Sequence, residues 1–184
     1  MNDWYTMDDV TNTVRPYKVY TALLTQSGAG SELNKSSGLL TEGVTYRIDD
    51  NSGGLDMTNV GAPNNDMGTY FVATGQVPNS YGSGNLTYDP GAPVAYVLEN
   101  NVGNIWFTYN GQGIYLINSN ELFLGKKTFF TITNTTNPSD VGNVVIYMYA
   151  NSIDNINIGA IAFPSGDSID SVMTGTPIEI RVYN

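Results

Sequence analysis

Short runs of β-branched and aromatic residues recur along this chain, and each is bounded by residues rich in glycine, proline or asparagine. Runs that are too short for helices and are closed by turn formers are typical of an antiparallel all-β domain. The 20 glycines, the 8 prolines and a charged fraction of only 13% fit many tight turns. We therefore predict an all-β fold, an antiparallel β-sandwich or jelly-roll-like single domain. The expected strands lie near residues 16–24, 44–48, 69–74, 93–99, 104–109, 112–118, 127–134, 144–150, 156–163 and 177–183.

The clearest local signal predicts a hairpin. Ile105–Tyr109 and Ile114–Ile117 flank the sequence Asn110-Gly111-Gln112-Gly113. An Asn-Gly pair can supply the positive φ angles of a tight primed turn, and the following glycine can form a bulge. We expect the two runs to pair across this turn.

Differences in residue composition along the sequence divide the chain into three parts. Residues 1–14 carry acidic and polar side chains without a periodic apolar face, and we expect them to form an arm outside the β-sandwich domain of residues 15–184. Trp4 and Tyr5 are candidate anchors of this arm on a neighbouring molecule; a frayed terminus is an equally compatible interpretation. Residues 29–92 contain many loop signals, and we interpret them as a loop-rich insertion or an extra layer.

The charge balance disfavours anionic partners. Seventeen acidic and seven basic residues give a net charge of −10, and among the basic residues only Lys126 and Lys127 are adjacent. Such a chain is repelled by nucleic-acid phosphates and by anionic membrane surfaces. The longest apolar stretch, Val144–Ala150, is far shorter than the roughly 20 residues of a membrane span. The N-terminal residues lack the basic and apolar regions of a signal peptide, so we do not expect Sec export. From the charge balance and the short apolar stretch, we expect neither a membrane nor a nucleic-acid partner.

The residue inventory restricts catalysis. Without histidine or cysteine, the chain cannot form a Ser-His-Asp triad, a thiolate nucleophile or a His or Cys metal site. Two carboxylates could still hydrolyse a glycosidic bond, and the least turn-like acids are Glu99, Glu121 and Glu179. Each is more simply a surface or edge charge, so we predict that the protein is not an enzyme.

Two oxygen-rich loops, residues 49–56 and 64–66, contain the hard ligands that calcium prefers. Counting from Asp49, however, the twelfth position is Val60, where the helix-loop-helix calcium motif requires a bidentate glutamate. Asp and Asn also favour ordinary turns by bonding their own backbone. We therefore predict no metal and no other cofactor.

The sequence is rich in aromatic side chains, with 13 tyrosines and 2 tryptophans. They suit protein interfaces and stacking on sugars, because they offer a large area and a polar tip. We expect Tyr81 and Tyr88, in predicted loops, to be interface candidates together with Trp4 and Tyr5. The aromatic residues of expected strands are predicted to be structural: Tyr70, Phe71, Tyr96, Trp106, Phe107, Phe129, Phe130, Tyr147 and Tyr149.

Several phrases of the sequence resemble small β-rich proteins that are encoded in the genomes of tailed bacteriophages. These are residues 16–28, residues 97–103 with Ile105-Trp106, and the ending 177–183. The intervening segment from Leu39 to Pro90 contains phrases similar to proteins of crAss-like and related phages: residues 43–48, 58–62 and 71–75. The matched phrases contain no catalytic residues.

This resemblance implies a virion component, such as a capsid decoration, a head fibre or a tail accessory protein. It implies a location on the capsid or tail surface, with identical subunits and other virion proteins as partners, and a homotrimer would suit a projecting fibre or knob. The alternative is a carbohydrate-binding module of a receptor-binding apparatus, which would bind a host surface glycan on Tyr81, Tyr88 or Trp106.

Overall fold

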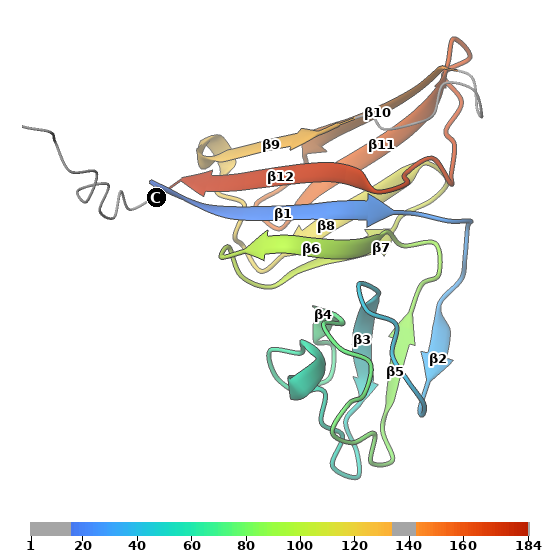
Figure 1. Cartoon of the computed structure of the whole chain (residues 1–184), viewed down its shortest axis with the longest axis vertical. Helices are drawn as coiled ribbons and strands as arrows, with labels where there is room; N and C mark the ends of the chain where they lie inside the picture. The colour runs from blue at the N-terminus through green and yellow to red at the C-terminus, as the bar shows by residue number, and fades with distance from the viewer. Residues whose placement is uncertain (1–15, 134–142, 184) are drawn as a thin grey trace, which may run out of the picture.

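In the computed structural model, residues 16–133 and 143–183 are described, and their strands form three four-stranded antiparallel sheets (Figure 1). The predicted arm, with Trp4 and Tyr5, lies outside the described residues. The all-β prediction is confirmed. The strands are β1 (Tyr17–Thr25), β2 (Leu33–Lys35), β3 (Thr45–Asp50), β4 (Tyr70–Val72), β5 (Asn85–Tyr88), β6 (Val94–Asn100), β7 (Ile105–Tyr109), β8 (Ile114–Ser119), β9 (Thr128–Ile132), β10 (Asn143–Ala150), β11 (Asn155–Phe163) and β12 (Thr176–Tyr183), with 3₁₀ turns η2 (Thr58–Val60) and η3 (Gly125–Lys127).

Two of the sheets form the sandwich. One has the strand order β6-β1-β12-β9 and the other β10-β11-β8-β7. Alternate residues of each strand point into the space between them, as in Ile178, Ile180 and Val182 of β12. These three side chains share one core with residues of the opposite sheet, such as Phe107 and Ile156. Burying each of these large side chains stabilises the fold by about 1.5–3 kcal/mol.

The segment interpreted as an insertion or extra layer holds the third sheet, in the order β2-β5-β3-β4. It has a hydrophobic core of its own, which includes Tyr46, Ile48, Met57, Phe71 and Leu86. Strands β2 and β5 were not predicted. They are three and four residues long, and their sequences Leu-Asn-Lys and Asn-Leu-Thr-Tyr are too short to display an alternating pattern.

Figure 1 shows the third sheet beneath the sandwich. Strands β3 and β4 of the third sheet contact β7 of the sandwich. Hydrogen bonds join the two parts. The backbone N–H of Phe107 donates to Thr45 Oγ1 at 3.0 Å, and the N–H of Ala95 donates to the carbonyl of Gly43 at 2.9 Å. These bonds fix Phe107 of β7 against Thr45 of β3, and Ala95 of β6 against Gly43, across the junction.

The predicted hairpin is present as β7 and β8, with Tyr109 opposite Tyr115. The predicted primed Asn-Gly turn is wrong, because the positive φ angles fall on Gly111 and Gly113 and not on Asn110. A Cβ atom on Gly113 would lie 2.5 Å from the carbonyl oxygen of Ala160. The close approach of β11 therefore requires glycine at position 113. The loop is longer than a two-residue turn, and its left-handed positions are Gly111 and Gly113.

Candidate functional site

The candidate catalytic acids Glu99, Glu121 and Glu179 do not converge on one cavity. Glu99 and Glu179 are register partners of Thr21 on its two sides, so both lie on the outer face of the first sheet. Glu179 forms an ion pair with Arg181. Glu121 follows β8 in an exposed loop with a positive φ of 56°.

In the oxygen-rich loops 49–56 and 64–66, Asp50 and Asp56 accept hydrogen bonds from protein groups. Asp56 accepts hydrogen bonds from the backbone and hydroxyl of Thr58 and from the amides of Asn65 and Asn79, and these bonds hold its pKa below the usual range. Asp50 accepts bonds from Ser52. Within the described ranges, no group of three or more Asp, Glu, His or Cys side chains is placed to hold a metal ion.

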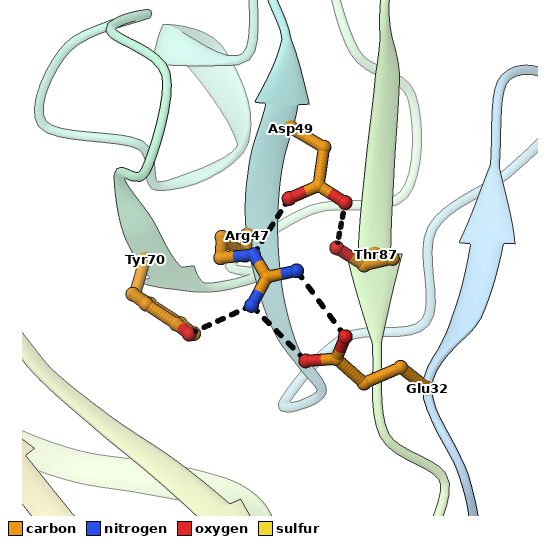
Figure 2. Close-up of polar contacts among 5 residues, drawn as sticks. All are labelled: Glu32, Arg47, Asp49, Tyr70 and Thr87. Carbon is orange, nitrogen blue, oxygen red and sulfur yellow. Dashed lines mark hydrogen bonds and ion pairs between the residues drawn. The ribbon is translucent and has the colours of Figure 1, made fainter.

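Arg47 is the centre of a polar cluster in the third sheet (Figure 2). Its guanidinium donates to both carboxylate oxygens of Glu32 at 3.1 and 3.2 Å and to Asp49 Oδ1 at 2.6 Å. It also donates to the hydroxyl of Tyr70 at 3.1 Å. Asp49 in turn accepts a bond from Thr87, so the cluster joins β3, β4 and β5 with the chain just before β2. The hydrogen bond from Arg47 is the main reason that the pKa of Asp49 is lowered.

The Arg47 cluster continues into the sandwich through stacked rings. The ring of Tyr70 lies parallel to that of Trp106 on β7, with centroids 5.4 Å apart and planes 10° apart. Asn104 Nδ2 donates to the carbonyl of Tyr70 at 2.8 Å. One ring face of Trp106 is therefore covered by Tyr70, which makes this tryptophan part of the junction between the sheets.

The predicted interface tyrosines of the insertion pack on the core of the third sheet. Tyr81 is half-buried and donates its hydroxyl hydrogen to the carbonyl of Gly38 at 3.0 Å. Tyr88 lies in β5 and not in a loop, and its ring centroid is 5.4 Å from that of Tyr46. Both tyrosines thus have structural partners that the sequence did not indicate.

Among the described residues, no charged side chain lies on the outer face of the sheet β10-β11-β8-β7, and we call this surface the uncharged face. The strand registers place its outward residues in continuous rows. Its members are Trp106, Thr108, Ile114, Leu116, Asn118, Val145, Tyr147, Tyr149, Asn155, Asn157, Gly159, Ile161 and Phe163. In a chain with a net charge of −10, a whole sheet face without an acid is a distinct surface.

Large apolar side chains of the uncharged face are open to solvent. Phe163 is 60% exposed, and Tyr147, Tyr149, Val145 and Ile114 are exposed as well. Tyr147 and Tyr149 stack with ring centroids 6.1 Å apart. Both tyrosines lie on strand β10 and pack on the face of its sheet, but the strand pattern did not indicate that no second layer among the described residues covers this outer face.

Tyr96 is a further aromatic residue of an expected strand whose side chain is open to solvent. It is 69% exposed, and it follows Ala95 on β6, an outer strand of its sheet. The next residues, Val97 and Leu98, are exposed too. The register between β6 and β1 shifts at this point, since Thr21 pairs with Glu99 and Ala22 with Val97, so Leu98 is the extra residue of a β-bulge. Bulges of this kind re-aim side chains at edges and beside binding sites.

Tyr96 lies on the wall of a half-open groove of about 710 Å³ between the third sheet and the sandwich. The apolar part of the wall comes from β4, β6 and β7, and includes Val72, Ala95 and Ile105. Binding sites frequently form where two structural units meet, as they do here.

Two glycines let the walls of the groove approach each other. A Cβ atom on Gly43 would lie 2.7 Å from the carbonyl oxygen of Ala95, and one on Gly61 would lie 2.5 Å from that of Val72. Both glycines have positive φ angles, so their backbones also suit this residue type. The backbone N–H of Gly43 donates a hydrogen bond to the carbonyl of Ala73, and its carbonyl accepts one from the N–H of Ala95. The groove is thus built by backbone contacts and not by mobile side chains.

The polar side chains of the groove wall come from Tyr20, Glu42, Thr74, Asn100 and Asn104. Glu42 is exposed at the wall, and Asn104 directs its Nδ2 to Tyr70, which leaves Oδ1 without a hydrogen-bond donor among the described residues. Tyr20 also belongs to the wall, and its hydroxyl is buried without a hydrogen-bond partner among the described residues. Burial raises the pKa of Tyr20. No lysine or arginine contributes to the groove wall as described.

The part of the chain that the structure describes contains no helix with the length and hydropathy needed to cross a bilayer. In comparisons with known proteins, no protein-family model, no curated protein and no solved structure matches this chain.

Proposed function

We propose that this protein is a structural component of a bacteriophage virion, on the capsid or tail surface, and that it acts by packing against identical copies and other virion proteins. The single observation that carries the proposal is the uncharged face. The resemblance of several sequence phrases to β-rich proteins of tailed phages supports the same conclusion.

The charge distribution favours contact through this face. Two copies that each carry a charge of −10 repel each other over most of their surfaces, and the repulsion is smallest where no acid comes near the contact. Exposed aromatic residues such as Tyr147, Tyr149 and Phe163 offer the large rigid area that interfaces favour. A contiguous exposed apolar face of this kind marks an interaction surface in a soluble protein.

Strand β10 extends the uncharged face to the side of the sheet. It is the terminal strand in the described order, it is eight residues long, and it contains neither proline nor a charged residue. Proteins commonly protect such strands with charges, prolines or a covering segment. A neighbouring subunit whose contact extends from the uncharged face over the edge of β10 would supply that protection.

The stoichiometry that we propose is a homotrimer, since closed rings are the usual form of self-association and a three-fold ring suits a projecting knob or fibre. Light scattering after gel filtration should then give a mass about three times the 19.9 kDa of one chain. Tyr147→Glu should give monomers, because association would bury an unpaired charge. Met67→Glu is the matched control: Met67 is a 65% exposed apolar residue outside the uncharged face, and its replacement should leave the trimer intact.

The virion location is tested separately, on particles of the phage that encodes the protein. Mass spectrometry of purified particles should detect it in many copies per particle. Particles that contain none of it would contradict the location, and a wild-type monomer at all concentrations would contradict packing through the uncharged face.

A further inference from the structure

We propose that Asn110 is a site of covalent modification, at which the side-chain amide is lost and an aspartate or isoaspartate forms at the border of the uncharged face. The backbone nitrogen of Gly111 attacks the side-chain carbonyl carbon of Asn110 and gives its proton to the leaving ammonia. Water then opens the five-membered succinimide ring. Breaking the new bond from the nitrogen to Cγ gives aspartate, and breaking the bond to the main-chain carbonyl carbon gives isoaspartate. Water is the only co-reactant.

The loop between β7 and β8 suits this ring closure. Asn110-Gly111 is the one Asn-Gly pair of the chain, and a nitrogen that belongs to glycine is the least hindered nucleophile. A Cβ atom built on Gly111 would meet nothing within 4 Å, so the ring has room to form. Asn110 is exposed at the tip of the hairpin, so water can reach the ring and open it.

The two reacting groups are not held by other contacts. Among the described residues, the side-chain amide of Asn110 has no hydrogen-bond partner, and neither has the backbone N–H of Gly111. The side chain can therefore turn its carbonyl carbon toward the nitrogen without breaking a bond of the folded state.

Other asparagines that precede a small residue are restrained. Serine follows asparagine at four places in the chain. In each of them the asparagine Nδ2 donates a hydrogen bond to a protein oxygen: Asn51 to Asn65, Asn79 to Asp56, Asn118 to Thr108 and Asn151 to Asn155. Ring closure at these sites costs that bond as well as the hindrance of the serine side chain. The structure thus favours Asn110 over the next most reactive sequences.

The product carries a charge beside the uncharged face. The N–H of Asn110 donates to the carbonyl of Ile114 at 2.9 Å, so the register that places Tyr109 opposite Tyr115 continues to Asn110 and Ile114. Opposite residues of an antiparallel pair lie on the same face, and Ile114 belongs to the uncharged face. A carboxylate at position 110 therefore opposes packing through this face. This consequence rests on the proposed function, whereas the reaction itself does not.

The isoaspartate product also alters the hairpin. It inserts one additional carbon atom into the main chain between positions 110 and 111. The N–H of Ile114 donates to the carbonyl of Gly111 at 2.9 Å, while the carbonyl of Ile114 accepts the bond from Asn110. A longer connection between the two partners of Ile114 cannot keep both bonds unchanged, so the backbone amide signal of Ile114 should shift in NMR spectra of the modified protein.

The test incubates the full-length protein at 37 °C and pH 9 in water enriched in oxygen-18, followed by peptide mass spectrometry. Position 110 should gain about 1 Da from the exchange of amide for acid and about 2 Da more from the heavy oxygen. The gain should be slower at pH 7, because the attacking nitrogen must lose its proton. Asn118 is the internal reference, and Asn110→Gln is the control variant, since glutamine would have to close a less favourable six-membered ring. The reaction is disproved if position 110 gains no mass, or if Asn118 gains it as fast.

The effect on packing is read from Asn110→Asp, which carries the product charge from the start. In gel filtration with light scattering, this variant should dissociate into monomers at higher protein concentration than Asn110→Gln, which has similar size and no charge. Trimers of equal stability in both variants would overturn the effect on packing. A wild-type protein that is monomeric at all concentrations would overturn the packing role, while the mass gain at position 110 would still support the reaction.

Discussion

Tyr115 donates its hydroxyl hydrogen to Asp170 Oδ1 at 2.7 Å, and this bond ties the loop before β12 to the β7–β8 hairpin. The same carboxylate accepts bonds from the hydroxyl of Tyr109 at 3.0 Å and from the N–H of Gly113 at 2.8 Å. These bonds hold the buried ring of Tyr115 and the carboxylate of Asp170 in fixed positions relative to each other.

Removing one bond of this cluster should lower stability measurably. Tyr115→Phe leaves the ring in the core but deletes a hydrogen bond to a charged acceptor, and we expect the free energy of unfolding to fall by about 1–3 kcal/mol. Urea denaturation measures the change. An unchanged midpoint would contradict a stabilising role for the bond.

The same replacement at Tyr20 should behave differently. Tyr20 is as deeply buried as Tyr115, but its hydroxyl has no partner among the described residues. Tyr20→Phe removes a polar group whose desolvation is uncompensated, so the free energy of unfolding should stay the same or rise by about 1 kcal/mol. A loss as large as that of Tyr115→Phe would mean that the Tyr20 hydroxyl has an acceptor.

Alkaline pH should destabilise the fold through its tyrosines. Burial raises the pKa of Tyr20 and Tyr115, and it raises that of Tyr81 to about 12. A raised pKa means that the neutral phenol is favoured in the folded state, so this stability is fully present below the unfolded pKa of about 10 and is lost as the pH rises above it. Denaturation midpoints from pH 8 to pH 12 should fall, and Tyr115→Phe should reduce the slope.

The Arg47 cluster should matter at acid pH. Because the pKa of Asp49 is lowered in the folded state, its contribution is present above the unfolded pKa of about 3.9 and is lost as the pH falls below that value. Asp49→Asn should flatten the decline in stability between pH 5 and pH 2. Arg47→Lys keeps the charge but loses the paired bonds to Glu32, and we expect a loss of about 1 kcal/mol at pH 7. Thermal melts across this pH range measure both effects, and identical curves for wild type and Asp49→Asn would contradict the assignment.

The ring of Tyr147 should require glycine on the neighbouring strand. A Cβ atom on Gly159 would lie 2.2 Å from Cζ of Tyr147, so Gly159→Ala must displace this ring from the uncharged face. We expect a change in tyrosine fluorescence, with a loss of stability of less than about 1 kcal/mol, because the end of the Tyr147 side chain is exposed and can turn aside. Gly75→Ala is the matched control, since its added methyl group would meet Val60 at an ordinary 3.6 Å. Unchanged tyrosine fluorescence in Gly159→Ala would contradict the packing of Tyr147 on Gly159.

The long strands were predictable because their runs of apolar residues are typical of β-strands. The ending 177–183 was expected as a strand and is found as Thr176–Tyr183, within one residue. The faces of the strands were less predictable. In β10, apolar residues stand on both faces, so the pattern cannot say that Tyr147 is open while Ile146 is buried. The groove was invisible in the sequence, because Glu42, Tyr96 and Asn104 meet only when the third sheet docks on β6 and β7.

The pairing of β1 with β12 sets the order in which the protein can be made. β1 has its neighbours in β6 and β12, and Tyr17 meets Tyr183 at the far end of the sequence. During synthesis, the first sheet therefore stays incomplete until the last strand has left the ribosome, whereas the third sheet is built from residues 33–88 and has its own core. Such distant pairings also make folding slow, on the order of milliseconds to seconds.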